Sequence, residues 1–184
     1  MSRLNELLQQ AGNIGRNEDG SITRLGFSEK YFQVLEFLKG RMRELGMQVE
    51  TDPVGNLHGV LQGSDPEAKS IVIDSHMDTV MQGGVYDGML DVTGAKYSTP
   101  CDPRWIKLID DVCTEKGISH IIMPSGAGHD ANAMAHEGVP IGMIFVPSAK
   151  GISHQGDEYT KPEHIDLRAD VLYQTVLKLD ENGF

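Results

Sequence analysis

The feature that most constrains the fold is an apolar run at residues 71–73, which ends in the polar sequence Asp74-Ser75-His76-Met77-Asp78-Thr79. A short apolar run of this kind is typical of a buried strand in an α/β sheet, and such sheets bind ligands at the carboxyl ends of their strands. Residues two apart on a strand point to the same face, so we expect the Asp78 carboxylate to contact the His76 ring and fix its tautomer. This pattern is typical of a metal-bound histidine with a supporting carboxylate.

A second acidic residue, Asp87, follows in the glycine-flanked sequence 83–88. Glycine permits unusual backbone angles, which would allow the loop to bring Asp87 back to the ion held by His76. From these residues alone, two interpretations stay open. In the first, His76 and Asp87 bind a metal; in the second, His76 caps a strand and Asp87 serves a turn.

Helical and strand-like patterns alternate along the rest of the chain. Apolar periodicity and capping residues predict helices over residues 2–10, 28–46, 102–117, 129–136 and 162–179. Strands are predicted at residues 47–51, 56–61, 71–73, 119–123 and 141–146, with the first two forming a hairpin. The alternation predicts an α/β fold, a three-layer sandwich with a central mixed sheet flanked by helices. We expect residues 1–184 to form a single catalytic-type domain.

Composition excludes several classes of function. The 184 residues include 27 acidic and 16 basic ones, and the net charge of −11 disfavours binding to a phosphate backbone. Cys101 and Cys113 make neither a disulfide framework nor a CxxC metal pair, which favours a reducing compartment. No apolar run approaches the length of a membrane span. We therefore expect a cytoplasmic protein with no nucleic-acid or membrane partner.

Two further loops follow predicted strands and carry polar side chains. Residues 124–131 join a strand to a helix through small residues, so their backbone N–H groups are candidates for binding a carboxylate. The alternative is a tight turn in which Asp130 serves the helix dipole. The loop at residues 147–154 ends in His154, which is either a ligand or ordinary polar surface. Because all three loops follow the carboxyl ends of predicted strands, we expect them at the same edge as His76, which favours a functional site there.

Four segments together resemble the zinc-peptidase-like amidohydrolases, in the branch of allantoate amidohydrolases and N-carbamoyl-amino-acid hydrolases. They are IDSHMDTV at residues 73–80, GGVYDG at 83–88, PSGAGHDA at 124–131, and IFVPS with GISH at 144–148 and 151–154. Four motifs in this order are far more specific than any one of them. The resemblance covers most of the chain from Asp52 onward.

The resemblance implies roles for individual residues. His76 resembles the first metal ligand, Asp78 the catalytic-site carboxylate that orients it, and Asp87 the carboxylate that bridges two ions. His154 resembles the terminal histidine ligand of the second ion. The residues that match the substrate-binding loop are Gly126, Gly128, His129 and Asp130. The implied cofactor is one or two zinc, manganese or cobalt ions, at partial occupancy. The implied reaction is hydrolysis of a linear C–N amide bond in a small ureido or N-acyl amino acid.

The sequence also departs from this family. The family's Glu-Glu pair, which supplies a general base and a metal ligand, has no counterpart here, and neither does its lid domain. Residues 88–102 therefore resemble a junction where the lid is missing. The acidic residues that are candidates to replace the base are Asp91, Glu158 and the pair Asp110-Asp111, although the helical pattern directs the pair to solvent. The alternative function is a lidless core that binds metal or small carboxylates without turnover, as a monomer or a homodimer unlike the family's.

Overall fold

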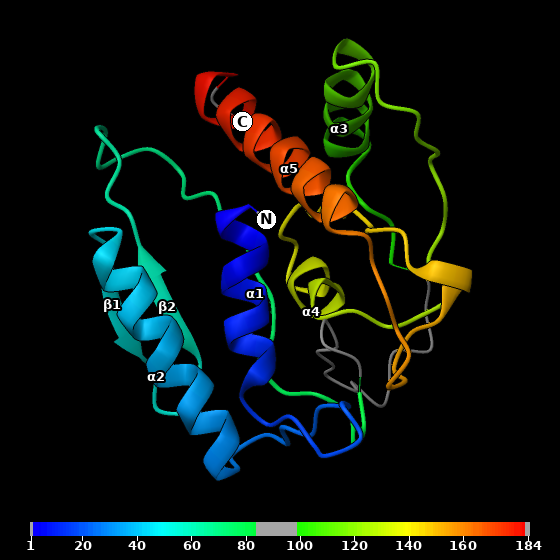
Figure 1. The fold of residues 1–184 in the computed structure, drawn as a ribbon. Coiled ribbons are helices and arrows are strands. Elements are labelled where there is room, and N and C mark those ends of the chain that lie inside the picture. The colour runs from blue at the N-terminus through cyan, green and yellow to red at the C-terminus, as the bar shows by residue number, and fades with distance from the viewer. Residues whose placement is uncertain (1, 84–98, 183–184) are drawn as a thin grey trace.

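The computed structural model describes residues 2–83 and 99–182. Figure 1 shows two packed groups of elements: the second helix lies against a β-hairpin, and the last helix lies between the first helix and the third. The elements are α1 (Arg3–Asn13), α2 (Glu29–Glu44), β1 (Gln48–Thr51), β2 (Leu57–Val60), α3 (Pro103–Glu115), α4 (Ala131–His136), the 3-10 turn η1 (Ala149–Gly151) and α5 (Pro162–Asn182). All five predicted helices are present, with ends that differ by a few residues.

Capping side chains fix where three of the helices begin. The Ser28 hydroxyl accepts a hydrogen bond from the backbone N–H of Tyr31 at 3.2 Å, and the Asp102 carboxylate accepts one from the N–H of Arg104 at 2.8 Å. Ser2 does the same for α1. These bonds satisfy N–H groups that have no partner within the helix. The helices predicted to begin at residues 2, 28 and 102 are therefore capped by the residues at those positions.

The predicted hairpin is also confirmed. Strands β1 and β2 pair antiparallel, with Gln48 opposite Val60 and Thr51 opposite Leu57. The Asp52 carboxylate closes the turn by accepting hydrogen bonds from the backbone N–H groups of Val54 at 3.0 Å and Asn56 at 2.8 Å. Side-chain bonds of this kind are a common reason for aspartate at the start of a turn.

The other three predicted strands are wrong for this structure. Residues 71–73, 119–123 and 141–146 have no ladder partner among the described residues, and the only sheet there is the two-stranded hairpin. Val72 is 68% exposed and Ile121 is 79% exposed, so these apolar runs are not buried strands. The predicted three-layer sandwich is accordingly absent from residues 2–83 and 99–182.

The segment at residues 141–144 shows what replaces strand pairing. It lies along α3, where the backbone N–H of Asp102 donates to the carbonyl of Ile141 at 2.9 Å. A Cβ atom at Gly142 would stand 3.1 Å from the Cβ of Trp105, a tighter contact than most side chains make, so the backbone runs close to the helix here. The apolar residues of this segment therefore pack on a helix rather than on a neighbouring strand.

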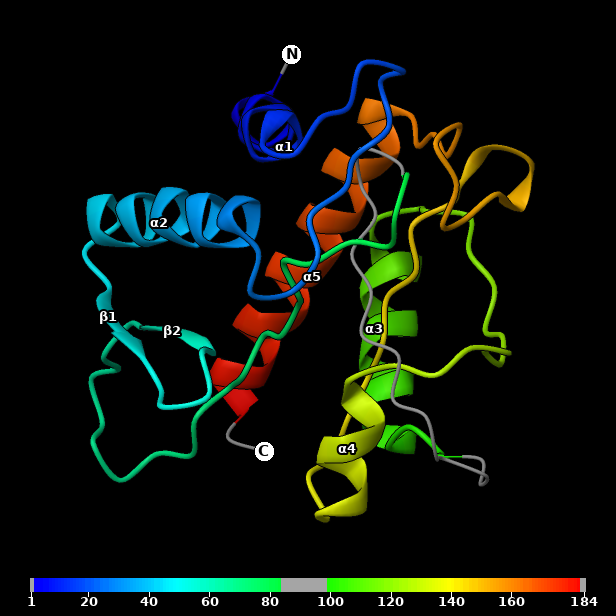
Figure 2. The same ribbon diagram turned by 90° about the horizontal axis from the view of Figure 1, so that it is seen from below.

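The main core lies between α3 and α5. Val112 and Cys113 of α3 pack with Val171 of α5, and all three are at most 1% exposed. Ile118 and Ile144 pack against this cluster from the segments outside the helices. The view in Figure 2 shows α3 and α5 side by side, in agreement with Figure 1.

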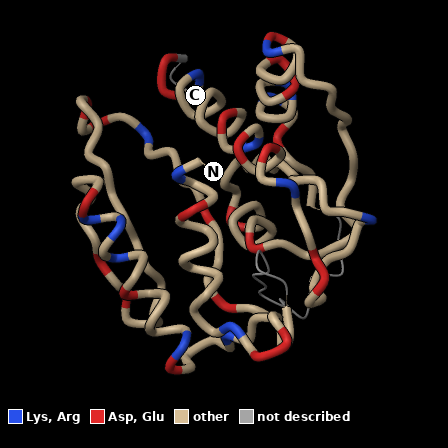
Figure 3. The backbone as a smooth tube through the Cα atoms, in the orientation of Figure 1, with Lys and Arg blue, Asp and Glu red and all other residues tan. Residues whose placement is uncertain are grey.

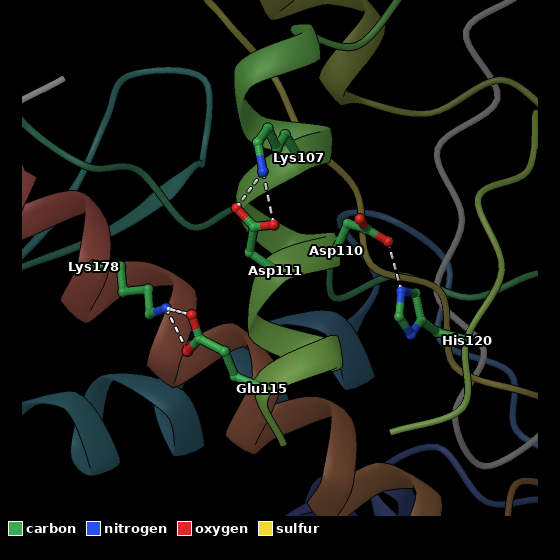
Figure 4. A network of polar contacts seen from close by, with 6 residues as sticks. All are labelled: Lys107, Asp110, Asp111, Glu115, His120 and Lys178. Atoms are coloured by element: carbon green, nitrogen blue, oxygen red, sulfur yellow. Dashed lines mark hydrogen bonds and ion pairs between the residues drawn. The ribbon is translucent and has the colours of Figure 1, made fainter. Parts of the chain in front are cut away.

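Polar contacts extend the same interface to its surface. Figure 4 shows Lys178 of α5 beside Glu115 of α3, where the ammonium lies 2.6 Å from the carboxylate, and the pair of Lys107 with Asp111 at 2.7 Å. On another side of α3, Nε2 of His120 lies 2.7 Å from an Asp110 oxygen, and Nδ1 lies 2.7 Å from the carbonyl of Ile118. Both ring nitrogens of His120 therefore face acceptors, an arrangement that only the doubly protonated ring satisfies fully.

His120 should make stability depend on pH. The Ile118 carbonyl and then the Asp110 carboxylate raise the pKa of His120 above its ordinary value of 6.5, against the opposing effects of burial and Arg168. A folded-state pKa above the unfolded one gives a contribution to stability that is complete below about pH 6.5. That contribution disappears as the pH rises through the folded-state value.

We expect the difference in unfolding free energy between the wild type and His120→Gln to be larger at pH 5.5 than at pH 9. Urea unfolding at the two pH values measures it, and His136→Gln, an exposed histidine of α4, is the control. An equal difference at both pH values would contradict the assignment.

Charged residues of both signs lie along the helices. Figure 3 shows Lys and Arg interspersed with Asp and Glu along α2 and α3. Among the described helices, none is both long and apolar enough to cross a membrane.

Candidate functional site

The His76 loop is fixed at its carboxyl-terminal end by a segment from early in the chain. The backbones of Ile22 and Gly83 exchange two hydrogen bonds of 2.8 Å. At the next paired position, the N–H of Thr79 donates to the carbonyl of Arg24 at 2.9 Å. The Thr79 hydroxyl in turn accepts from the N–H of Arg24 at 2.8 Å. Ile22 is fully buried and Thr79 is 4% exposed. This pairing sets the position at which the chain leaves the site.

The Arg24 side chain reaches further into the loop. Its Nε atom donates to the carbonyl of Met77 at 2.5 Å, and Nη1 donates to the carbonyls of Ile14 at 2.8 Å and Ala11 at 3.2 Å. Arg24 is only 7% exposed. The guanidinium therefore links the end of α1 to the residue that lies between His76 and Asp78.

His76 and Asp78 lie as the sequence predicts. Nδ1 of His76 is 3.3 Å from Oδ1 of Asp78, and both side chains are about a quarter exposed. A carboxylate at Nδ1 holds the imidazole so that its other nitrogen, Nε2, faces outward. The predicted contact is present, whereas the predicted metal and catalytic roles of the two residues stay predictions.

The loop at residues 125–130 converges on the same place. Burial raises the pKa of the Asp130 carboxyl above its ordinary value, the charge of His76 opposes this rise, and Asp74 and Asp78 add to it. Charges shift the pKa of a carboxyl only over short distances, so Asp130 lies within electrostatic range of these three residues. The structure thus brings Asp130 to the His76–Asp78 pair, although 52 residues separate Asp78 from Asp130 in the sequence.

The remaining residues of this loop have separate environments. Nε2 of His129 is 2.7 Å from the Ser125 hydroxyl, and the His129 ring lies 5.7 Å from the ring of Phe145. Gly126 and Gly128 are exposed, with open space where a Cβ would be. Helix α4 starts after Asp130 without a hydrogen bond from that side chain, so Asp130 does not cap it. The loop is accessible to a small molecule, and its predicted substrate-binding role stays a prediction.

His154 lies in a different setting. Its backbone is in the left-handed region, with φ of 59°, and its N–H donates to the Glu158 carboxylate at 3.1 Å. The pocket that it lines is formed by Asp19, Ser21, Met81, Gln82, Gln155 and Gly156. Met81 and Gln82 belong to the carboxyl-terminal part of the His76 loop, and no residue of the 125–130 loop lines this pocket. The structure therefore places His154 beside residues 81–82, and its predicted role as a metal ligand stays a prediction.

Asp87 and Asp91 lie outside the described residues. Of the candidate replacement bases, Asp110 and Asp111 are engaged by His120 and Lys107 on the surface of α3, as the helical pattern predicts. In the two described ranges, no group of three His, Cys, Asp or Glu side chains is arranged to hold a metal ion.

Three residues near the site were not predicted. Asp74 lies close enough to Asp130 to raise the pKa of its carboxyl. Tyr31 lies within range of Asp78: burial, followed by the charges of Asp78 and Asp52, raises the pKa of the Tyr31 phenol. Asp74 immediately precedes the predicted metal motif and was the one residue with a sequence signal. Tyr31 follows the apolar period of α2, and Arg24 is an isolated basic residue in a loop, so neither pattern pointed to the site.

Comparison with known proteins gives a family assignment. Residues 42–178 match Peptidase family M20/M25/M40. The N-carbamoyl-L-amino acid amidohydrolase of Geobacillus stearothermophilus is 37% identical over 90 residues, which are 49% of this chain and 22% of the relative. The allantoate amidohydrolase of Bacillus subtilis (strain 168) is 33% identical over 92 residues, 50% of this chain and 22% of the relative.

A plant protein shows a similar likeness. The ureidoglycolate hydrolase of Oryza sativa subsp. japonica is 37% identical over 75 residues, 41% of this chain and 16% of the relative. The matches thus cover less than a quarter of the length of these curated relatives. The family is of α/β fold and generally metal-dependent, in agreement with the fold class and cofactor class predicted from the motifs.

Proposed function

This chain belongs to peptidase family M20/M25/M40, and we propose that it is a metal-dependent hydrolase of linear C–N amide bonds in small ureido or N-acyl amino acids. The observation that carries the proposal is the contact of His76 with Asp78, joined by Asp130 from a distant loop. The relatives are named for hydrolysis of N-carbamoyl-L-amino acids, allantoate and ureidoglycolate, and these names support the substrate class.

The donor chemistry of these residues fits a divalent metal. Imidazole nitrogen and carboxylate oxygen are ligands for zinc, manganese and cobalt-class ions. His76 would bind through Nε2, because Nδ1 faces Asp78 at 3.3 Å. We propose Asp87 and His154 as the further ligands that the family motifs indicate. A second ion with so few ligands would be held weakly, so partial loading is expected.

The residues of the chain have separable tasks in this scheme. A metal bound there would polarise the amide carbonyl and lower the pKa of a bound water. Asp78 holds the His76 ring in one orientation, and the exposed loop with Gly126, Gly128 and His129 faces the small-molecule substrate. Asp130 adds a carboxyl within electrostatic range of the histidine. No Glu-Glu pair is present in the sequence, so general-base assistance worth about 10² to 10⁴-fold is expected to be missing.

The missing Glu-Glu pair favours a second candidate function. A chain that keeps metal-binding motifs but has no Glu-Glu pair is suited to bind metal or a small carboxylate without turnover. The two functions share the site and differ only in the chemical step. They are therefore separated by measuring binding and turnover on the same preparation.

The test uses protein stripped by a chelator and reloaded with zinc, manganese or cobalt. We expect slow release of ammonia from N-carbamoyl amino acids or allantoate, or of free amine from N-acetyl amino acids, that depends on the added metal and is lost in His76→Ala. His136→Ala, which removes an exposed histidine of α4, should retain the wild-type rate. Turnover no faster than in His76→Ala, with metal bound to the wild type, would reject hydrolysis and favour the binding function.

A further inference from the structure

We infer that Arg24 is a positioning residue for the His76–Asp78 pair, which it holds by binding the backbone between them. The inference rests on the proposed function for its consequence, the affinity for metal. Arg24 lies outside the family match at residues 42–178, so the match assigns it nothing. Its place in the site comes from the structure alone.

The contact is specific to the residue that separates the predicted ligand from its supporting carboxylate. Nε of Arg24 donates to the carbonyl of Met77 at 2.5 Å, and that carbonyl belongs to the peptide joining Met77 to Asp78. Charge-assisted hydrogen bonds such as this one are shorter and stronger than those between neutral groups. A change at position 24 therefore acts directly on the backbone that carries Asp78.

The guanidinium is itself held in place. Nη1 donates to the carbonyls of Ile14 and Ala11 at the end of α1, and the residue is 7% exposed. The backbone of Arg24 is paired with Thr79 through two further hydrogen bonds. Arg24 thus binds the loop at Met77 with its side chain and at Thr79 with its backbone, on either side of Asp78.

The segment before His76 provides little alternative support. Residues 71–75 have no strand partner in the described part of the chain, and Val72 and Ile73 are 68% and 63% exposed. The geometry of His76 relative to Asp78 is accordingly set from the Arg24 side. Lysine would supply a charge without the planar fork that reaches several carbonyls at once, so it should substitute only in part.

Two variants test the role of Arg24. Arg24→Met keeps a long side chain but removes every side-chain donor, and Arg24→Lys keeps the charge. The structural control is Val171→Ala, which weakens the core between α3 and α5 and leaves the His76 loop intact. Cobalt(II) affinity is measured for all three and for His76→Ala, at a temperature where circular dichroism shows each protein folded. We expect Arg24→Met to weaken binding about tenfold or more, the size typical of losing a group that orients a ligand, with Arg24→Lys in between and Val171→Ala unchanged.

A second readout needs no metal. In ¹⁵N-histidine-labelled protein above pH 8, the nitrogen shifts of His76, assigned by their loss in His76→Ala, report which ring nitrogen carries the proton. We expect Nδ1–H in the wild type and Val171→Ala, and a mixture of tautomers in Arg24→Met. If Arg24→Met does not fold, Arg24→Lys provides both readouts with smaller shifts of the same sign.

The outcomes separate the two proposals. Wild-type binding that does not depend on His76 would reject the proposed metal site, and the tautomer measurement would still decide the role of Arg24. A wild-type tautomer and affinity in Arg24→Met and Arg24→Lys, or equal losses in Arg24→Met and Val171→Ala, would overturn the inference.

Discussion

Replacing Asp78 by asparagine is expected to lower the metal affinity of the chain 10- to 100-fold, the range found when a carboxylate that orients a metal-bound histidine is removed. The physical reason is the 3.3 Å contact between Oδ1 of Asp78 and Nδ1 of His76. The neutral amide keeps the shape of the side chain but loses the charge that fixes the tautomer and raises the basicity of the ring. Isothermal titration with zinc or cobalt measures the change.

The matched control for this prediction is Asp110→Asn. Asp110 of α3 also pairs with a histidine, at 2.7 Å from Nε2 of His120 in the segment that follows the helix, and this pair lies outside the site. The Asp110→Asn substitution should therefore leave the metal affinity unchanged. A similar loss in both variants would show that the effect is general, and no loss in Asp78→Asn would remove Asp78 from its assigned role.

Replacing Ile22 by alanine is expected to lower the free energy of unfolding by about 2–5 kcal/mol, the usual cost of truncating a large buried aliphatic side chain. Ile22 is fully buried, and its backbone bonds to Gly83 connect the early segment to the end of the His76 loop. Ile22→Val should cost only about 0.5–1.5 kcal/mol. Urea unfolding followed by circular dichroism measures both.

The Val72→Ala variant tests whether residues 71–73 are exposed. The apolar pattern predicts Val72 in a buried strand, whereas the structure leaves it 68% exposed. Substitutions at exposed positions usually change stability by no more than about 0.5 kcal/mol, and this is the expected result. A loss as large as that of Ile22→Ala would mean that residues 71–73 are buried in the folded protein.

These contrasts show which parts of the structure could be predicted from the sequence. Helices α2 and α3 were predictable because their caps, Ser28 and Asp102, act on N–H groups two or three residues away. The hairpin of β1 and β2 was predictable for the same reason, since its turn is closed locally by Asp52. The strands predicted at residues 119–123 and 141–146 are wrong, because a strand needs a partner from elsewhere in the chain and an apolar run does not specify one.

The candidate site shows the same difference between local and long-range contacts. His76 and Asp78 are two residues apart, so their contact follows from local geometry. The sequence motifs already placed the Asp130 loop at the edge that carries His76, and Asp130 lies within electrostatic range of His76 in the structure. The hydrogen bond from Arg24 to Met77 joins segments about 50 residues apart, and nothing in the local pattern of Arg24 predicts it. His154 was assigned from a motif, and the structure shows it lining a pocket with Asp19 and Gln82, so its role as a ligand stays a prediction. Long-range packing therefore decided what the motifs left open.

The most direct test of the metal site compares the metal content of the wild type and His76→Ala. Both proteins are stripped, incubated with equimolar zinc, passed through a desalting column and analysed by elemental mass spectrometry. We predict that the wild type retains zinc, at one ion or less per chain, and that His76→Ala retains none above the level of a chelator-treated blank. Equal zinc in the two proteins would contradict the assignment of His76 as a ligand and, with it, the proposed metal-dependent hydrolase.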